Sequence, residues 1–249
     1  MNLPVLFKTP ERRVTFISST RSLFKYINRK CNRFAILGIS IILFLILQIL
    51  VGCMICIRSN TRPYDSGIVL KDSVHKAFDF NSKSLNIIVK CLSFIIIGVT
   101  MVSFFFYQYP VQIYQRFFFT LSILTFIRIL FLSSTYFPGP ANHCNCVPPK
   151  IYKLNFVSII TNLTDLDACN TLFPAFVYMS IACGCFWSAY LHPTISQAIC
   201  AIVFLISFLE IVSRRAYTFD VLMTGIISVS VFELLQNCFP SDPEENKKQ

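Results

Sequence analysis

The sequence predicts an all-α, polytopic integral membrane protein: a bundle of six transmembrane helices with both termini in the cytosol. Of its 249 residues, 55% are hydrophobic and only 14% are charged, whereas soluble domains carry about 25% charged residues. The mean hydropathy is +0.62. The 26 phenylalanines lie in long apolar blocks, several of which reach the ~20 residues that cross a bilayer's hydrocarbon. These observations exclude an ordinary soluble domain.

Residues 1–33 form a basic segment directly before the first apolar block. Its charged residues are Lys8, Arg12, Arg13, Arg21, Lys25, Arg29, Lys30 and Arg33, opposed by Glu11. Such a cluster beside a span is typical of the cytosolic side, where it faces anionic lipid. It lacks the alternation of basic and aromatic residues that nucleic-acid binding would favour. The formal net charge of +10 therefore indicates a membrane surface and not a nucleic-acid partner.

The membrane domain is predicted at 34–239, with a cytosolic tail at 240–249. Its six apolar spans are 34–57, 85–106, 117–136, 172–191, 196–212 and 217–239. The first is longer than the core of a signal peptide and is interpreted as an uncleaved signal anchor. With a cytosolic N-terminus, the loops 58–84, 137–171 and 213–216 are exoplasmic. Asn162 begins a glycosylation sequon in the second loop, which agrees with this orientation.

Five ionisable residues fall inside the predicted spans, where charge is costly and marks candidate functional positions. They are Lys90, Arg128, Glu210, Asp220 and Glu233. One interpretation is a pocket in the outer leaflet for a phosphate-bearing lipid headgroup. The alternative is structural: ion pairs between helices, including Glu210 with Arg214 four residues later, and a Lys90 that snorkels to the interface. Spacing leaves both open for Arg128 and Asp220 and favours the structural alternative for the others.

Three segments carry a resemblance to a known family. Residues 116–119 read RFFF and precede Arg128, residues 137–148 read FPGPANHCNCVP, and residues 217–221 read YTFDV. In this order and spacing they resemble the sphingomyelin synthases, a branch of the lipid phosphate phosphatase superfamily that moves headgroups between lipids. The resemblance covers roughly residues 60–235 and is best over 116–235. It implies the same six-span order and a site in the exoplasmic half of the membrane.

The departures from this family concern its catalytic residues. Its two histidines correspond to Val177 and Ala216 here, whereas the aspartate that orients a histidine is retained as Asp220. Nucleophilic attack on a phosphate and proton transfer need a lone pair with a pKa near neutrality. Neither Val177 nor Ala216 has one, so no catalytic residue is assigned. The loss of one member of such a unit typically removes about 10⁴–10⁶ of the rate.

The exoplasmic loop 137–171 contributes the remaining candidates. His143 lies in the best-matched segment and is a candidate for headgroup binding, although a structural role in the loop is favoured. Cys144, Cys146 and Cys169 share its compartment, and a disulfide from Cys169 to either of the others suits an oxidising lumen. Zinc binding by the Cys-x-Cys pair and His143 is the alternative, but the spacing of these ligands is atypical of zinc sites. No metal and no cofactor are predicted.

Three functions follow as hypotheses. The first is a catalytically inactive relative that binds or regulates phospholipid and sphingolipid headgroups through Arg128, His143 and Asp220, alone or as a homo- or hetero-oligomer with active relatives. The second is a remodelled phosphocholine or phosphoethanolamine transferase to ceramide, or a lipid phosphatase. The third is an unrelated six-span transporter or scaffold. The resemblance implies the Golgi or endoplasmic reticulum, with the plasma membrane as an alternative.

Overall fold

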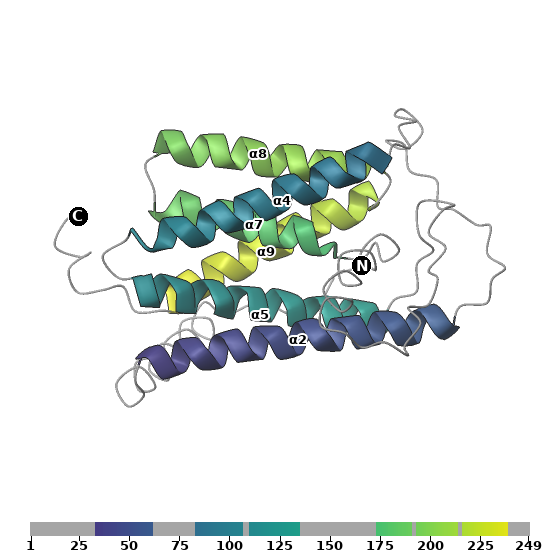
Figure 1. Ribbon diagram of the computed structural model, residues 1–249, viewed down its shortest axis with the longest axis horizontal. Coiled ribbons are helices and arrows are strands. Elements are labelled where there is room, and N and C mark those ends of the chain that lie inside the picture. The colour runs from purple at the N-terminus through teal and green to yellow at the C-terminus, as the bar shows by residue number, and fades with distance from the viewer. Residues whose placement is uncertain are drawn as a thin grey trace, which may run out of the picture.

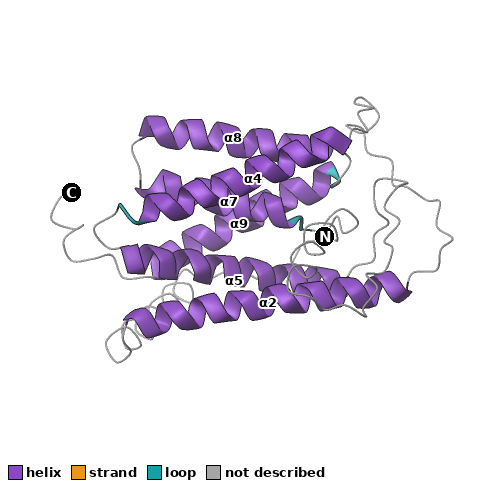
Figure 2. Ribbon diagram, viewed as in Figure 1, coloured by secondary structure: helices purple, strands orange, loops and turns teal. Residues whose placement is uncertain are grey.

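The computed structural model describes residues 33–61, 83–106, 110–134, 173–190, 193–213 and 216–238. These residues form six helices with a few turn and bend residues at their ends, and the predicted all-α class is confirmed for them (Figure 2). The helices are α2 (Arg33–Thr61), α4 (Lys83–Phe104), α5 (Pro110–Ser134), α7 (Ala175–Tyr190), α8 (Pro193–Val212) and α9 (Thr218–Cys238).

Five of the helices are long and apolar enough to cross a membrane, and the sixth is shorter. The candidate spans are Phe34–Met54, Ile87–Phe104, Val111–Ser134, Pro193–Val212 and Thr218–Asn237. Helix α7 has 16 residues, about 24 Å of helix, less than the ~30 Å of a hydrocarbon core. The chain is therefore a multi-pass helical membrane protein, with α7 as a shorter apolar helix where a full span was predicted.

Consecutive helices run in opposite directions through the bundle (Figure 1). Helices α4, α7 and α9 begin at one end, where α2, α5 and α8 finish. We call this the Ala175 end, after the first residue of α7, and the opposite end the Tyr190 end, after its last. The first and last described residues, Arg33 and Cys238, both lie at the Tyr190 end. Which of the two ends faces the cytosol stays a prediction from charge.

Helix α7 occupies the centre of the bundle, where it packs against α4, α5, α8 and α9, while α2 packs along α5. Its ring Phe186 meets Phe117 edge-on at 5.1 Å and Phe232 at 4.9 Å between ring centroids. Such aromatic pairs contribute about 0.5–1.5 kcal/mol beyond the area they bury. In lipid, close packing replaces the hydrophobic effect between helices, so these contacts from three helices stabilise the core directly.

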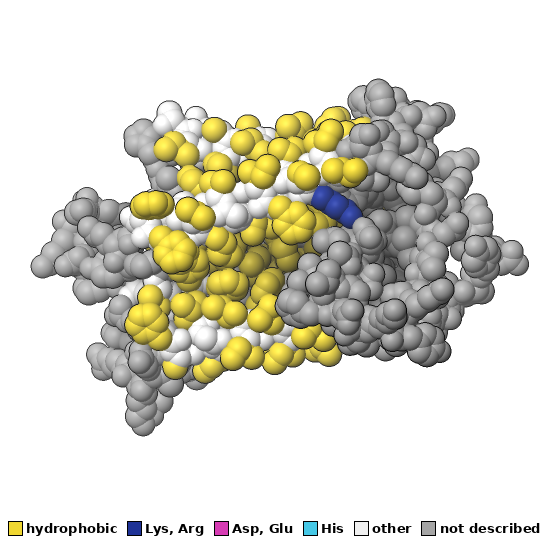
Figure 3. All heavy atoms as spheres, viewed as in Figure 1, with side chains coloured by type: hydrophobic (Ala, Val, Ile, Leu, Met, Phe, Trp, Pro, Cys, Tyr) yellow, Lys and Arg dark blue, Asp and Glu magenta, His cyan; other side chains and the backbone are white. Residues whose placement is uncertain are grey.

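The outer surface of the helices is apolar, as a lipid environment requires. Figure 3 shows hydrophobic side chains over nearly all of the described surface on one face. Phe34, Ile39 and Phe204 are 68%, 62% and 75% exposed. In water a continuous apolar surface of this kind would promote aggregation. The exposure of large apolar side chains thus agrees with the apolar composition that predicted a membrane protein.

Helix α5 begins earlier than predicted, at Pro110 and not at residue 117. The polar residues Gln112, Gln115 and Arg116 lie before the predicted span, and in the structure they form part of the first two turns of the helix. Proline is favoured at the first position of a helix, because its missing N–H has no partner there. The guanidinium of Arg116 donates to the hydroxyl of Tyr190 over 2.7 Å, so this polar start is held against the end of α7.

Gly184 sets the approach of α7 to α8, which gives a first testable prediction. A Cβ built at Gly184 would lie 3.4 Å from Val203 Cγ2, whereas one built at Gly98 meets nothing within 4 Å. We expect Gly184→Leu to lower the free energy of unfolding by about 1–3 kcal/mol, because it overpacks this contact. Gly98→Leu is the matched control and should leave it nearly unchanged. Equal effects in a thermal-unfolding measurement in detergent would contradict this packing.

Candidate functional site

The structure divides the five predicted intramembrane charges into two groups. Arg128, Glu210 and Asp220 are buried, with 2%, 2% and 7% of their surface exposed. Lys90 is half-buried and Glu233 is exposed. Since ionised groups are buried only where the protein compensates them, the three buried residues are the candidates for a site. Glu210, for which spacing had favoured a structural pair, thereby joins the two preferred positions.

Arg128 lies beside the first turn of α7. One turn before it on α5, the hydroxyl of Thr125 is 3.1 Å from the hydroxyl of Tyr178. Three residues after it, the ring of Phe131 stacks on Phe173 with centroids 5.8 Å apart. Contacts on both sides of Arg128 therefore reach the start of α7. Arg128 therefore lies in the half of α5 that is nearer the Ala175 end of the bundle.

Glu210 and Asp220 reach the same end through the turn between α8 and α9. The backbone N–H of Ala216 donates to the carbonyl of Glu210 over 3.4 Å, which holds the start of α9 against the end of α8. Asp220 lies in the first turn of α9. A carboxylate is favoured there by the helix dipole and the free N–H groups of the first turn.

Val177 and Ala216, the positions that correspond to the two family histidines, come together. Both have no exposed surface, and they form one buried cluster with Ile211 and Val221. Val177 comes from the first turn of α7, Ala216 from the turn before α9, and Val221 follows Asp220 directly. This cluster, which we call the Val177 cluster, is the apolar wall beside the buried charges. Residues of α7, α8 and α9 that are distant in sequence thus meet in one buried cluster.

A network of neutral polar groups joins three helices at this level. The side-chain amide of Gln48 on α2 donates to Thr125 Oγ1 over 3.2 Å and to the Tyr178 hydroxyl over 3.1 Å. Tyr178 has no exposed surface. This network could not be predicted from the sequence, because a single glutamine inside a long apolar run forms no periodic pattern with other polar residues. It fixes α2 against the start of α7.

Phe173 has an unusual backbone, with φ at 60°. Bulky residues rarely adopt this left-handed conformation, which costs of order 1–3 kcal/mol. Its ring is stacked between Phe131 and Tyr178, at 5.8 and 5.4 Å, and Pro174 follows before the helix begins. These contacts stabilise the turn that starts α7 beside the buried charges. Nothing in the sequence pattern identified it.

Several predicted candidates lie outside the described residues. They are His143, the sequon residue Asn162, and the cysteines Cys144, Cys146 and Cys169. The histidines His75 and His192 also lie outside them. The disulfide, the glycosylation and the part of His143 in headgroup binding therefore stay predictions.

The chemistry of the described residues fits the binding of a charged group, and neither Val177 nor Ala216 is a nucleophile. A guanidinium binds phosphate through paired, charge-assisted hydrogen bonds, and carboxylates bind an ammonium group. Arg128 supplies the first, whereas Glu210 and Asp220 supply the second. The methyl and isopropyl groups of the Val177 cluster can neither accept a proton nor attack phosphorus. The arrangement suits a zwitterionic headgroup.

The Gln48 network gives a second prediction, on stability. Tyr178→Phe removes the hydroxyl that Gln48 and Thr125 contact, and we expect it to lower the free energy of unfolding by about 0.6–2 kcal/mol. Gln48→Leu should cost a similar amount. Because the two residues contact one another, the double variant should cost clearly less than the sum of the single changes. A strictly additive double variant, measured by unfolding in mixed micelles, would show that the two side chains act independently.

Comparisons of the chain with known protein families and with curated proteins find no match. Fold and composition establish a multi-pass helical membrane protein with three buried charges beside the start of α7.

Proposed function

We propose that this protein is a catalytically inactive relative of the sphingomyelin synthases that binds phospholipid or sphingolipid headgroups at the Ala175 end. The resemblance rests on short motifs, and the convergence of Val177 and Ala216 is the observation that supports it. An accidental likeness between two separate segments gives no reason for the corresponding residues to pack together. Here they lie in one buried cluster, which also contains Val221, the residue that follows Asp220.

The side chains at this end favour binding over turnover. Arg128 is positioned for the phosphate, and Glu210 and Asp220 for the ammonium group of choline or ethanolamine. The Val177 cluster replaces the imidazoles with hydrocarbon. Such a protein would bind a headgroup without transferring it to another lipid. It would sense or partition lipids, or regulate active relatives through an oligomer.

The proposal places the Ala175 end on the exoplasmic side, in agreement with the positive charge before α2. Its residence is the Golgi or endoplasmic reticulum, with the plasma membrane as the alternative. Glycosylation at Asn162 tests the orientation, since only an exoplasmic loop is modified. Modification of the wild type, lost in Asn162→Gln, is the expected result, whereas protease access to loop 137–171 from the cytosol would contradict it.

The function is tested with purified full-length protein in nanodiscs. We expect saturable binding of a phosphatidylcholine that carries a headgroup spin label, and no transfer of labelled phosphocholine to ceramide above a mock-purified control. Asp220→Asn should weaken binding roughly tenfold or more, because hydrogen bonds to charged groups contribute about 1.5–3 kcal/mol. Glu233→Gln, an exposed carboxylate nearer the Tyr190 end, is the matched control and should bind as the wild type does.

The other functions predict different outcomes in the same experiment. Product that forms with the wild type and disappears in Asp220→Asn would show a remodelled transferase. Release of inorganic phosphate from a phosphatidic acid substrate would show a phosphatase. Absence of saturable headgroup binding in folded protein would overturn the proposal and leave a transporter or scaffold.

A further inference from the structure

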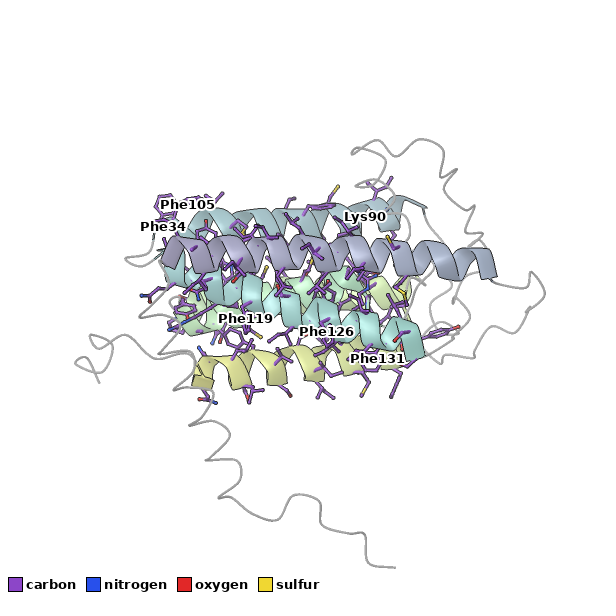
Figure 4. The ribbon with its side chains drawn as sticks, turned by 90° about the horizontal axis from the view of Figure 1, so that it is seen from below. Phe34, Lys90, Phe105, Phe119, Phe126 and Phe131 are labelled. Atoms are coloured by element: carbon purple, nitrogen blue, oxygen red, sulfur yellow. The ribbon has the colours of Figure 1, made fainter. Side chains whose placement is uncertain are left out.

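A hollow lined by apolar side chains separates α4 from α2 on one face of the bundle. It is visible in the space-filling view (Figure 3), with α7 and α9 behind it in the ribbon of the same view (Figure 1). In Figure 4, α2 and α4 lie toward the top of the picture, which is the side that faces the viewer in Figure 1. Helix α2 packs along α5, and α4 mainly along α7 and α8. The hollow therefore opens sideways, into the space that lipid fills.

One side of α4 forms a wall of this hollow. Lys90, Phe94, Ile97 and Met101 follow one another at intervals of four, three and four, so they share one face of the helix. Ile97 and Met101 are half-buried and pack against the core cluster. Phe94 is 53% exposed, and its ring meets the buried ring of Phe176 edge-on at 5.5 Å. We call this row of residues the α4 wall.

Helix α2 borders the hollow on the opposite side (Figures 1 and 3). The side-chain amide of Gln48 on α2 donates to the hydroxyl of Tyr178 on α7, so the Gln48 network joins α2 to the central helix.

A basic residue lies at the Ala175 end of the hollow. Lys90 is placed there by Figure 4, and the basic side chain beside the hollow in Figure 3 has the same position. From Lys90 to Met101 the helix rises by about 16 Å, close to half of a ~30 Å hydrocarbon core. An ammonium group at the interface with one leaflet's depth of apolar wall matches a lipid with a phosphate and a hydrocarbon chain.

The hollow also adjoins the candidate site. Phe176, which Phe94 contacts, is 6% exposed and precedes Val177 in the first turn of α7. The Phe94–Phe176 ring pair therefore joins the α4 wall to the turn of α7 that also carries Val177. A lipid chain held along the α4 wall would bring its headgroup to the end of the bundle where Arg128 and Asp220 are buried.

We propose that the hollow between α4 and α2 is a lateral binding groove for one acyl chain of a glycerophospholipid, with its phosphate beside Lys90 and with Phe94 separating the chain from the headgroup site. The groove and Lys90 do not depend on the proposed function, and only the passage of the headgroup toward Asp220 rests on it. In a bilayer the chain is held by shape and dispersion contacts, because lipid tails are as apolar as the groove.

The test uses full-length protein in vesicles that contain a phosphatidylcholine with a diazirine near the end of one acyl chain. After irradiation, labelled residues are identified by mass spectrometry. We expect labelling concentrated on Phe94, Ile97 and Met101 of the α4 wall. The other side of the same helix, Ile88, Ile95 and Val99, is exposed to ordinary lipid and should be labelled several-fold less. Equal labelling of both sides would overturn the groove without any variant.

A matched pair of substitutions adds a second measurement. Ile97→Trp fills the groove and should reduce labelling of α4 several-fold, whereas Ile95→Trp, two residues away on the other side of the helix, should not. If Ile97→Trp does not fold, Ile97→Phe takes its place, and unchanged labelling in the folded variant would also overturn the proposal. Asp220→Asn should leave chain labelling intact while headgroup binding weakens. Loss of headgroup binding alone would thus contradict the proposed function and not the groove.

Discussion

Replacement of Arg128 by methionine is expected to lower the free energy of unfolding by about 3–5 kcal/mol, because removing one member of a buried charged group leaves the others uncompensated. The guanidinium is 2% exposed, and the carboxylates of Glu210 and Asp220 are buried at the same end of the bundle. Methionine retains much of the side-chain volume, so the loss reports charge and hydrogen bonding more than packing. The measurement is reversible unfolding in mixed micelles.

Arg116→Met provides the matched control for this prediction. Arg116 lies on the same helix, is only half-buried, and donates to Tyr190 at the opposite end. Its replacement should cost no more than about 1.5–3 kcal/mol, the range of one hydrogen bond from a charged donor. If the two variants lose the same free energy of unfolding, Arg128 does not compensate the buried carboxylates. The inference of a charged site at this end would then be contradicted.

Ala216→Leu is the second change with a large expected effect. Ala216 has no exposed surface and contacts the Val177 cluster, while its N–H donates to Glu210 at the α8–α9 turn. Three added carbons cannot fit without moving Val177 or Val221. We expect an overpacking cost of about 1–3 kcal/mol or more, together with loss of headgroup binding. Thermal unfolding and the spin-label assay measure the two effects separately.

Ala201→Leu is the control that isolates the site. Ala201 is exposed on α8, where a larger apolar side chain meets lipid and should change little. An Ala216→Leu variant with normal stability and normal binding would show that the Val177 cluster is not closely packed around Ala216. It would then not be the wall of a headgroup site.

The sequence predicted the helices well and their surroundings less well. Long apolar runs fixed five spans, because hydrocarbon demands about 20 apolar residues whatever the fold. The third span was predicted to start at residue 117, whereas α5 begins at Pro110, because hydropathy does not count the polar first turns of a helix, which here are held by Arg116 to Tyr190. The length of α7 was overestimated, because hydropathy cannot foresee the turn at Phe173 and Pro174.

The candidate site was predictable in its members and not in its assembly. The cost of charge in hydrocarbon singled out five residues, of which Lys90 is half-buried and Glu233 is exposed, whereas Arg128, Glu210 and Asp220 are buried. Their common end follows from the alternating directions of the helices. The Gln48 network and the stacked Phe173 depend on contacts between helices distant in sequence, and spacing along one chain does not encode such contacts. His143 and its neighbouring cysteines stay predictions.

The shortness of α7 has a consequence for how the membrane meets this protein. A central helix of about 24 Å, enclosed by longer neighbours, cannot reach both faces of a ~30 Å hydrocarbon layer. With a deficit of several ångströms, α7 stops below the level that its neighbours α5, α8 and α9 reach at one or both ends. The polar backbone groups at such an end then lie within the depth of the hydrocarbon layer and are covered by protein and not by lipid, which is where a membrane protein tolerates them.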